Sequence, residues 1–180
     1  MQSILQRLRE SSNAKKVLCI DGPAGAGKTE LSTLIAAEFP DSFIVHMDDL
    51  YDGWNDSLGD ALTGRLQSTI IEPLLTNKDL VLQKYDWIAE RFSAPYVVAI
   101  PSLLIVEGVG AAQKIMREIA TLKVFVDVDD KTGKERVINR DGDYMVGRID
   151  DWQRQQTEHY KKHRTRESCD LVLGATWWEN

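Results

Sequence analysis

The most informative stretch of the sequence is Gly22-Pro23-Ala24-Gly25-Ala26-Gly27-Lys28-Thr29. It matches the pattern G-x-x-x-x-G-K-S/T, in which glycines let backbone N–H groups surround the phosphates of a nucleotide. A continuous apolar run at 17–20 precedes it, and apolar residues at helical spacing follow it. The pattern has meaning in this setting because the N-terminus of the following helix adds partial positive charge. The sequence therefore predicts a nucleotide site, and we call residues 22–29 the phosphate loop.

Two side chains of the phosphate loop have specific expected roles. Lys28 should reach the β- and γ-phosphates, and the Thr29 hydroxyl should ligate Mg²⁺. We therefore expect ATP and Mg²⁺ as cofactors, although a glycine turn that merely caps a helix is the alternative. The predicted cofactor-binding residues are Gly22, Pro23, Ala24, Gly25, Ala26, Gly27, Lys28, Thr29 and Glu30.

Outward from the phosphate loop, strand and helix patterns alternate. Apolar runs predict strands at 17–20, 43–47, 103–106, 122–128 and 171–173. Helical spacing predicts helices at 1–12, 28–39, 58–75, 111–120, 130–140 and 150–166. Two further short strands, at 80–82 and 96–100, can pair as an excursion from the core. This alternation predicts an α/β fold, a three-layer α/β/α P-loop NTPase with a mainly parallel sheet.

Length and composition limit the classes of protein that the chain can represent. A chain of 180 residues suits one domain, 1–180, and 43% apolar with 28% charged residues is ordinary for a globular protein. The net charge of −6 argues against binding to nucleic acid or to a membrane surface. The N-terminus lacks the apolar core of a signal peptide, and no window is long enough to span a membrane. With only Cys19 and Cys169, the chain is expected in the reducing cytoplasm.

The charges are unevenly distributed along the chain. Residues 41–60 contain six acids and no Lys or Arg, whereas residues 130–166 contain ten bases and seven acids. Solvated helix faces would explain this pattern without any function. The alternative is one site where a basic segment covers an anion and an acidic segment holds a metal and a hydroxyl.

Among proteins with a phosphate loop, a small-molecule kinase fits this chain best. GTPases read guanine with an N-K-x-D element, and in Asn77-Lys78-Asp79 the acid stands one place early. Large motor ATPases need a longer chain. Two alternatives stay open, a regulatory ATPase or switch protein without a small-molecule acceptor and a binding module that has lost turnover. Acceptor-dependent release of ADP would separate the kinase from the regulatory ATPase, and the presence of Lys28, Thr29, Asp48 and Glu107 argues against the binding module.

Six short segments, in order from about residue 17 to 173, resemble the uridine kinase-like family of P-loop kinases. The first is the phosphate loop, and the others are similar to the family's D-x-F-Y, Y-D-F, E-G-I/V, Arg-rich lid and A-D-hydrophobic segments. Here they read Asp48-Asp49-Leu50-Tyr51, Tyr85-Asp86-Trp87 with Arg91, Ile105-Val106-Glu107-Gly108-Val109, Arg136 with Arg140-Asp141, and Cys169-Asp170-Leu171-Val172. The resemblance implies transfer of the γ-phosphate of Mg·ATP to a hydroxyl of a small molecule, a nucleoside being one candidate.

Two acids at strand ends are the candidates for the chemistry. Asp48 lies 20 residues after Lys28, at the end of a predicted strand, where ligand sites of α/β proteins form. The resemblance implies that Asp48 orients the acceptor hydroxyl and takes its proton, with Asp49 as the rival one place on. Glu107 ends the strand at 103–106 and is expected to hold Mg²⁺ together with Thr29 and Asp48.

The basic segment is predicted to form a lid over approximately residues 136–150. Arg136 and Arg140 share a helix face, and Arg148 follows the stretch 141–147, in which Gly142 and Gly147 bracket a short segment that could hinge. Guanidinium groups that close over the γ-phosphate would stabilise the charge in transfer, so Arg136 and Arg140 are predicted as catalytic. Surface ion pairs are the alternative.

The predicted acceptor residues are Tyr51, Asp56, Tyr85 and Arg91. A flat slot lined by Tyr51 and Tyr85 would favour a planar base, and a small polar pocket would favour a sugar. Glu90, Gln83-Lys84 and residues 54–57 depart from the family pattern, so uridine or cytidine as the acceptor stays open. The oligomeric state is not predicted.

Aromatic and histidine side chains outside these sets receive structural interpretations. Trp87 is expected to serve in packing and His46 to lie in the core. His159 and His163 are expected to be solvated helix residues. The pair Trp177-Trp178 is expected to dock the tail or a partner.

Overall fold

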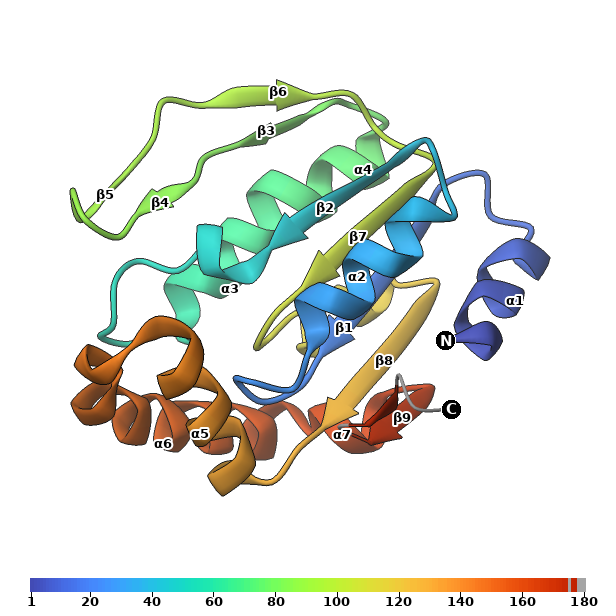
Figure 1. The fold of residues 1–180 in the computed structure, drawn as a ribbon. Helices are drawn as coiled ribbons and strands as arrows, with labels where there is room; N and C mark the ends of the chain where they lie inside the picture. The colour runs from blue at the N-terminus through green and yellow to red at the C-terminus, as the bar shows by residue number, and fades with distance from the viewer. Residues whose placement is uncertain (175, 178–180) are drawn as a thin grey trace.

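The computed structural model describes residues 1–174 and 176–177. Five parallel strands form the central sheet in the order β2 (Ser42–His46), β7 (Leu103–Glu107), β1 (Lys16–Asp21), β8 (Leu122–Asp127) and β9 (Leu171–Gly174) (Figure 1). The central strand β1 and its neighbour β7 are buried on both faces, as a parallel sheet requires, and their sequences are nearly continuous apolar runs.

Two hydrophobic cores lie on opposite faces of the sheet because successive strand residues point to opposite sides. On one face, Leu18 and Ile20 of β1 pack with α1 (Gln2–Glu10) and α2 (Lys28–Ala37). On the other face, Val17 and Cys19 pack with α3 (Asp60–Leu66), the π-helical stretch η2 (Gln67–Ile71) and α6 (Val146–His163). This arrangement confirms the predicted three-layer α/β/α fold.

The remaining helices connect these layers. The helix α4 (Glu72–Thr76) continues the π-helical stretch, and α5 (Asp130–Asp141) leads through the 3-10 turn η4 (Asp143–Met145) into α6. A short α7 (Thr165–Ser168) precedes β9. No helix in the described ranges is both long and apolar enough to cross a membrane.

The segment between α4 and β7 forms a long antiparallel excursion. Its strands β3 (Leu80–Leu82) and β6 (Tyr96–Val98) pair with each other, as do β4 (Tyr85–Asp86) and β5 (Arg91–Phe92). Figure 1 shows β3 and β6 beside α4, with β4 and β5 at the far end of the excursion. Contacts of β4 with the 3-10 turn η1 (Met47–Asp49) bring this end to the region that follows β2.

One predicted helix is wrong. The segment 111–120 contains only a 3-10 helix, η3 (Lys114–Glu118), preceded by tight turns. The N–H groups of Gly110 and Ala112 donate to the buried carboxylate of Asp21, at 3.0 and 2.8 Å. Because these amides are fixed in a loop around Asp21, the α-helix suggested by the apolar spacing does not form.

Candidate active site

The phosphate loop joins β1 to α2 and is packed closely against α5. A Cβ on Gly25, whose φ is +78°, would lie 2.4 Å from the carbonyl oxygen of Gly133. A Cβ on Gly133 would in turn lie 2.6 Å from the carbonyl oxygen of Ala24. Only glycine fits at both positions of this close approach. The start of α5 therefore fixes the outer side of the phosphate loop.

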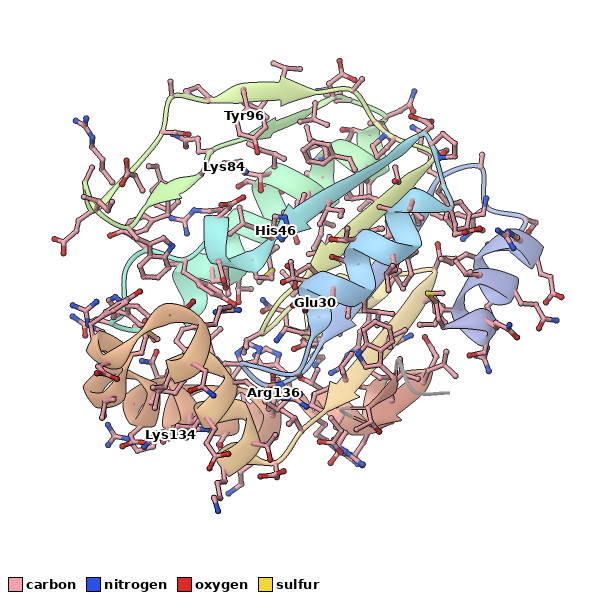
Figure 2. The ribbon with its side chains drawn as sticks, in the orientation of Figure 1. Glu30, His46, Lys84, Tyr96, Lys134 and Arg136 are labelled. Carbon is pink, nitrogen blue, oxygen red and sulfur yellow. The ribbon has the colours of Figure 1, made fainter. Side chains whose placement is uncertain are left out.

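Lys28 lies at the start of α2 and is buried, with its Nζ donating to the carbonyl oxygen of Pro23 at 2.8 Å. Burial lowers the pKa of Lys28, and the nearby Glu107 carboxylate is the strongest charge opposing that fall. A buried ammonium at the N-terminus of a helix suits an anionic ligand. Glu30 follows Thr29 in the first turn of α2, is exposed, and is labelled in Figure 2.

Asp21, a buried acid at the end of β1, is a residue that the sequence analysis did not select. Its carboxylate accepts from the N–H groups of Gly22, Gly110 and Ala112, and from the Tyr160 hydroxyl of α6 at 3.3 Å. Burial raises the pKa of Asp21, and these backbone hydrogen bonds oppose the rise. Asp21 thus ties the phosphate loop to the loop after β7 and to α6. The only signal in the sequence was an acid directly after an apolar run.

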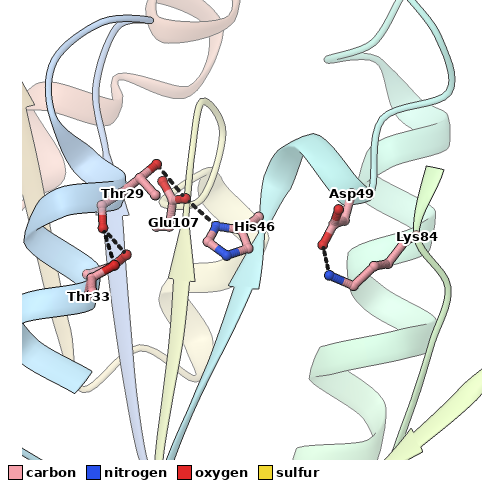
Figure 3. A network of polar contacts seen from close by, with 7 residues as sticks. Thr29, Thr33, His46, Asp49, Lys84 and Glu107 are labelled. Carbon is pink, nitrogen blue, oxygen red and sulfur yellow. Dashed lines mark hydrogen bonds and ion pairs between the residues drawn. The ribbon is translucent and has the colours of Figure 1, made fainter. Parts of the chain in front are cut away.

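A hydrogen-bonded network joins α2, β7 and β2 (Figure 3). The Thr29 hydroxyl donates to Glu107 Oε1 at 3.0 Å, and His46 Nδ1 lies 2.5 Å from the same oxygen. The hydrogen bond to Glu107 raises the pKa of His46. The expectation that His46 lies in the core is wrong, since the ring is half-buried and contacts a cavity carboxylate.

Asp48 and Asp49 face different surroundings. Asp48 lines the cavity described below, whereas Asp49 forms an ion pair with Lys84 at 3.0 Å (Figure 3). The Asp48 side chain is open to the cavity, but the protein atoms around it replace much of its bulk water. This desolvation raises the pKa of Asp48, and the Glu107 carboxylate adds to the rise.

A cavity of about 490 Å³ opens beside the phosphate loop, and its two ends differ in chemistry. We call one the polar end, formed by Lys28, Thr29, Asp48, Glu107 and Arg140. We call the other the aromatic end, formed by Tyr51, Trp54, Trp87, Tyr144 and Trp152. Ring centroids at the aromatic end are 4.9 Å apart for Trp54 and Trp87 and 5.1 Å apart for Tyr51 and Trp152. The cavity therefore joins a charged site to a wall of aromatic rings.

The predicted lid segment, 136–150, comprises the end of α5, η4 and the first turn of α6. Arg140 lines the cavity and binds both carboxylate oxygens of Asp141 at 2.7 Å. Arg148 also lines it, with its guanidinium 5.3 Å from the Trp54 ring centroid. Arg136 instead donates to the carbonyl oxygen of Gly25 at 3.2 Å, and Figure 2 shows it between α5 and the phosphate loop.

The four predicted acceptor residues lie in different places. Tyr51 is buried in the cavity wall, with its hydroxyl donating to the Val109 carbonyl oxygen at 2.8 Å. Tyr85 packs against Trp87 from outside the cavity lining, at a centroid distance of 5.0 Å. Asp56 lines a neighbouring cavity of about 410 Å³. Arg91 is exposed on β5.

Trp87 does more than the packing expected of it. Its ring lines the cavity, and its indole N–H donates to the carbonyl oxygen of Asp48 at 3.2 Å. The adjacent Ile88 also lines the cavity and is 97% exposed. The family resemblance marked the segment Tyr85-Asp86-Trp87 but directed attention to Tyr85, and the place of Trp87 in the cavity depends on the tertiary packing of the hairpin.

The expectation for the two histidines of α6 is wrong for His159, which is buried. Its Nδ1 lies 3.2 Å from the Leu58 carbonyl oxygen, and its ring stacks on His163 at a centroid distance of 4.3 Å. His163 is half-buried and accepts from the Lys114 N–H at 3.2 Å. Trp177 is buried against the α1 and α2 side of the sheet, and Trp178 lies outside the described residues.

The oxygen atoms at the polar end fit Mg²⁺, which prefers hydroxyl and carboxylate ligands. Thr29 and Glu107 are in direct contact, and Asp48 lines the same cavity. Within the part of the chain that the structure describes, no three His, Cys, Asp or Glu side chains form a metal cluster.

The parallel sheet, the phosphate loop and the buried Lys28 define a P-loop nucleotide-binding protein of α/β/α architecture. No family model matches the chain. Uridine kinase of Streptococcus pneumoniae is 28% identical to it over 148 residues, which cover 72% of this chain and 68% of that protein. The motif resemblance to uridine kinase-like P-loop kinases is thereby confirmed.

Two solved structures share the fold. A protein of Bacillus stearothermophilus described as a possible uridine kinase superposes with a TM-score of 0.69 at 19% identity, covering 96% of both chains. A Silicibacter sp. TM1040 protein described as a putative fructose transport system kinase superposes with a TM-score of 0.64 at 17% identity, again covering 96% of both chains. Together with the sequence match, these similarities support a P-loop kinase.

Proposed function

We propose that this chain is a phosphotransferase that moves the γ-phosphate of Mg·ATP to a hydroxyl of a small molecule. The observation that carries the proposal is a single cavity lined by Lys28, Thr29, Asp48, Glu107 and Arg140. Phosphoryl transfer depends mainly on positioning and on stabilising charge, and these residue types supply both. The similarity to uridine kinase adds a nucleoside as one candidate acceptor.

Each polar side chain has a role in this proposal. The phosphate loop and Lys28 hold the β- and γ-phosphates, while bound Mg²⁺, held by Thr29 and Glu107, would neutralise phosphate charge. Asp48 orients the acceptor hydroxyl and receives its proton. A raised pKa suits a group that must accept a proton during the reaction. Asp49 is less suited because Lys84 already holds its carboxylate.

The segment 136–150 serves as the lid in this proposal. It brings Arg140, Tyr144 and Arg148 to the same cavity that the hairpin carrying Trp87 also lines. Closure of the segment would place Arg140 over the phosphates and exclude water. Arg136 acts on the phosphates through the phosphate-loop backbone that it already contacts.

The acceptor carries a flat ring in this proposal. Tyr51, Trp54, Trp87 and Trp152 form the wall beside Asp48, and Tyr85 supports Trp87 from behind. Aromatic walls stabilise planar ligands by stacking, whereas a sugar needs polar partners. The hydrogen bond from Trp87 to the Asp48 backbone keeps this wall in a fixed position relative to the candidate base.

The deciding experiment is an ADP-release screen with Mg·ATP over nucleosides, vitamins and sugars. An acceptor-dependent rise in ADP supports the kinase, whereas ADP release that no acceptor increases would indicate the regulatory ATPase instead. Location in the cytoplasm and the absence of nucleic-acid partners stay predictions from composition.

Asp48→Asn and Asp49→Asn provide a matched pair of variants for the same assay. Asp48→Asn should lower kcat about 10³-fold and leave ATP binding within about twofold, because its carboxylate acts on the acceptor. Asp49→Asn removes only an ion pair near the surface, so its kcat should stay within about fivefold of the wild type. Equal losses in both variants, or loss of ATP binding in Asp48→Asn, would contradict the assignment.

A further inference from the structure

His46 and Glu107 occupy paired positions at the carboxyl ends of adjacent strands. The register of β2 and β7 places the two residues side by side, so their side chains leave the same face of the sheet. His46 Nδ1 lies 2.5 Å from Glu107 Oε1. An ionised carboxylate can only accept, so Nδ1 carries the proton of this contact. The contact therefore fixes both the ring and the carboxylate.

The same carboxylate oxygen receives a second hydrogen bond. The Thr29 hydroxyl donates to Glu107 Oε1 at 3.0 Å, so both contacts end on one oxygen (Figure 3). In residues 1–174 and 176–177, no hydrogen bond ends on Oε2, and Glu107 lines the cavity. One oxygen of Glu107 is thus held by the protein while the other stays available to a ligand.

The Lys28 ammonium is an alternative partner for the Glu107 carboxylate, in competition with His46. The Glu107 carboxylate is the strongest charge acting on the Lys28 ammonium, yet no ion pair within 4 Å joins them among the described residues. Lys28 instead contacts Pro23. A Glu107 side chain without its His46 contact could turn toward Lys28, and that ion pair would withdraw both groups from the phosphates.

We propose that His46 is a positioning residue that holds Glu107 in the orientation needed for Mg·ATP, an inference that rests on the proposed function. His46 does not touch the nucleotide in this proposal. It acts through Glu107, and through Glu107 on the Thr29 hydroxyl. Loss of a hydrogen-bond partner behind a metal ligand commonly weakens metal affinity about 10- to 100-fold.

The test compares His46→Ala, His46→Asn and a matched control, Thr33→Ala. In His46→Asn the side-chain amide can stand in for the Nδ1 donor, so this variant should restore the contact. Thr33 donates to the Thr29 carbonyl oxygen at 2.8 Å and does not contact Glu107. Binding of a fluorescent ATP analogue is measured in EDTA and across a Mg²⁺ titration, and steady-state rates are measured over the same Mg²⁺ range.

His46→Ala should raise the Mg²⁺ concentration for half-maximal binding and rate about tenfold, leaving the affinity in EDTA within about twofold. His46→Asn should recover most of this loss, and Thr33→Ala should match the wild type. Equal weakening of His46→Ala binding in EDTA and in Mg²⁺, or no change at all, would overturn the positioning role.

If His46→Ala does not fold, His46→Leu takes its place in the comparison, because it fills more of the volume of the ring and still lacks a donor. A wild-type Mg²⁺ dependence in His46→Leu would overturn the positioning role in the same way. A wild-type chain without Mg²⁺-enhanced nucleotide binding would count against the proposed function itself.

Discussion

The two ends of the cavity are built by different parts of the chain. At the polar end, Lys28 begins the helix after β1, Asp48 follows β2, and Glu107 ends β7. These positions lie at the carboxyl edge of one parallel sheet, so the fold itself brings them together. At the aromatic end, Trp54 and Trp87 come from a loop and a hairpin outside that sheet.

The two ends also differ in how their side chains are held. The polar end is fixed by hydrogen bonds, such as those of Thr29 and His46 to Glu107. The aromatic end is held mainly by tilted ring contacts, with the Trp87 N–H bonded to the Asp48 backbone. Hydrogen-bonded networks preorganise charge for chemistry, whereas ring contacts tolerate changes in ligand shape. This difference suggests that chemistry resides at one end and acceptor selection at the other.

The largest effect is expected from Lys28→Ala, which tests whether the polar and aromatic ends of the cavity bind their ligands independently. Removing the buried ammonium should lower kcat/KM for ATP by about 10³-fold, because charge stabilisation at the phosphates is lost. Acceptor binding, followed by tryptophan fluorescence without nucleotide, should stay unchanged. Lys84→Ala is the matched control, since it removes an ammonium that pairs with Asp49 near the site. Loss of acceptor binding in Lys28→Ala would show that the ends are one unit.

Gly133→Ala tests whether the polar end depends on the close packing of α5. The new Cβ would lie 2.6 Å from the Ala24 carbonyl oxygen and would displace the phosphate loop. We expect ATP affinity, measured by calorimetry, to fall about tenfold, since small misplacements of positioned groups have large effects. Gly64→Ala is the matched control, because a Cβ there would meet no atom of a neighbouring described element within 4 Å. Unchanged ATP affinity in Gly133→Ala would show that the polar end does not depend on the packing of α5 against the phosphate loop.

Trp87→Ala tests the aromatic end. The acceptor KM should rise about tenfold, in line with the loss of one stacking partner, while the KM for ATP stays within about twofold. Trp87→Phe should recover most of the acceptor affinity because it keeps a flat ring and loses only the N–H contact with Asp48. A fall in kcat as large as that of Asp48→Asn would instead assign Trp87 to positioning of the base.

The sequence predicted the polar end better than the aromatic end for a physical reason. The phosphate loop, Asp48 after β2 and Glu107 at the end of β7 are local signals, since each follows an apolar run. Trp87 and His159 have no such signal, because their roles depend on partners 39 and 101 positions away in the chain. The predicted helix at 111–120 is wrong for a similar reason, since the distant Asp21 accepts from the N–H groups of Ala112 and of Gly110 just before the segment.

The smallest effect concerns His159, a buried residue of α6 behind the cavity. Its Nδ1 side faces the Leu58 carbonyl oxygen, and its Nε2 side faces Gly110 in the loop after β7. Burial, with a smaller effect of Lys162, lowers the pKa of His159 to about 4. The unfolded chain, with a histidine pKa of about 6.5, therefore binds more protons between about pH 6.5 and pH 4, so stability falls as the pH falls through this window.

His159→Asn should remove this dependence because its side-chain amide takes the place of Nδ1, can still donate to the Leu58 carbonyl oxygen, and does not titrate. From about pH 7 to pH 5, the wild type should lose about 2 kcal/mol more than the variant, or about 5 °C in Tm. The measurement to compare is the difference in Tm between the two chains. The raised pKa values of Asp21 and Asp48 stabilise both folded chains as the pH falls, which opposes the effect of His159. Half-buried His163 is present in both chains, and its pKa is lowered mainly by burial, with a smaller effect of His159. Parallel curves of Tm against pH for the two chains would contradict the lowered pKa of His159 and its part in the pH dependence of stability.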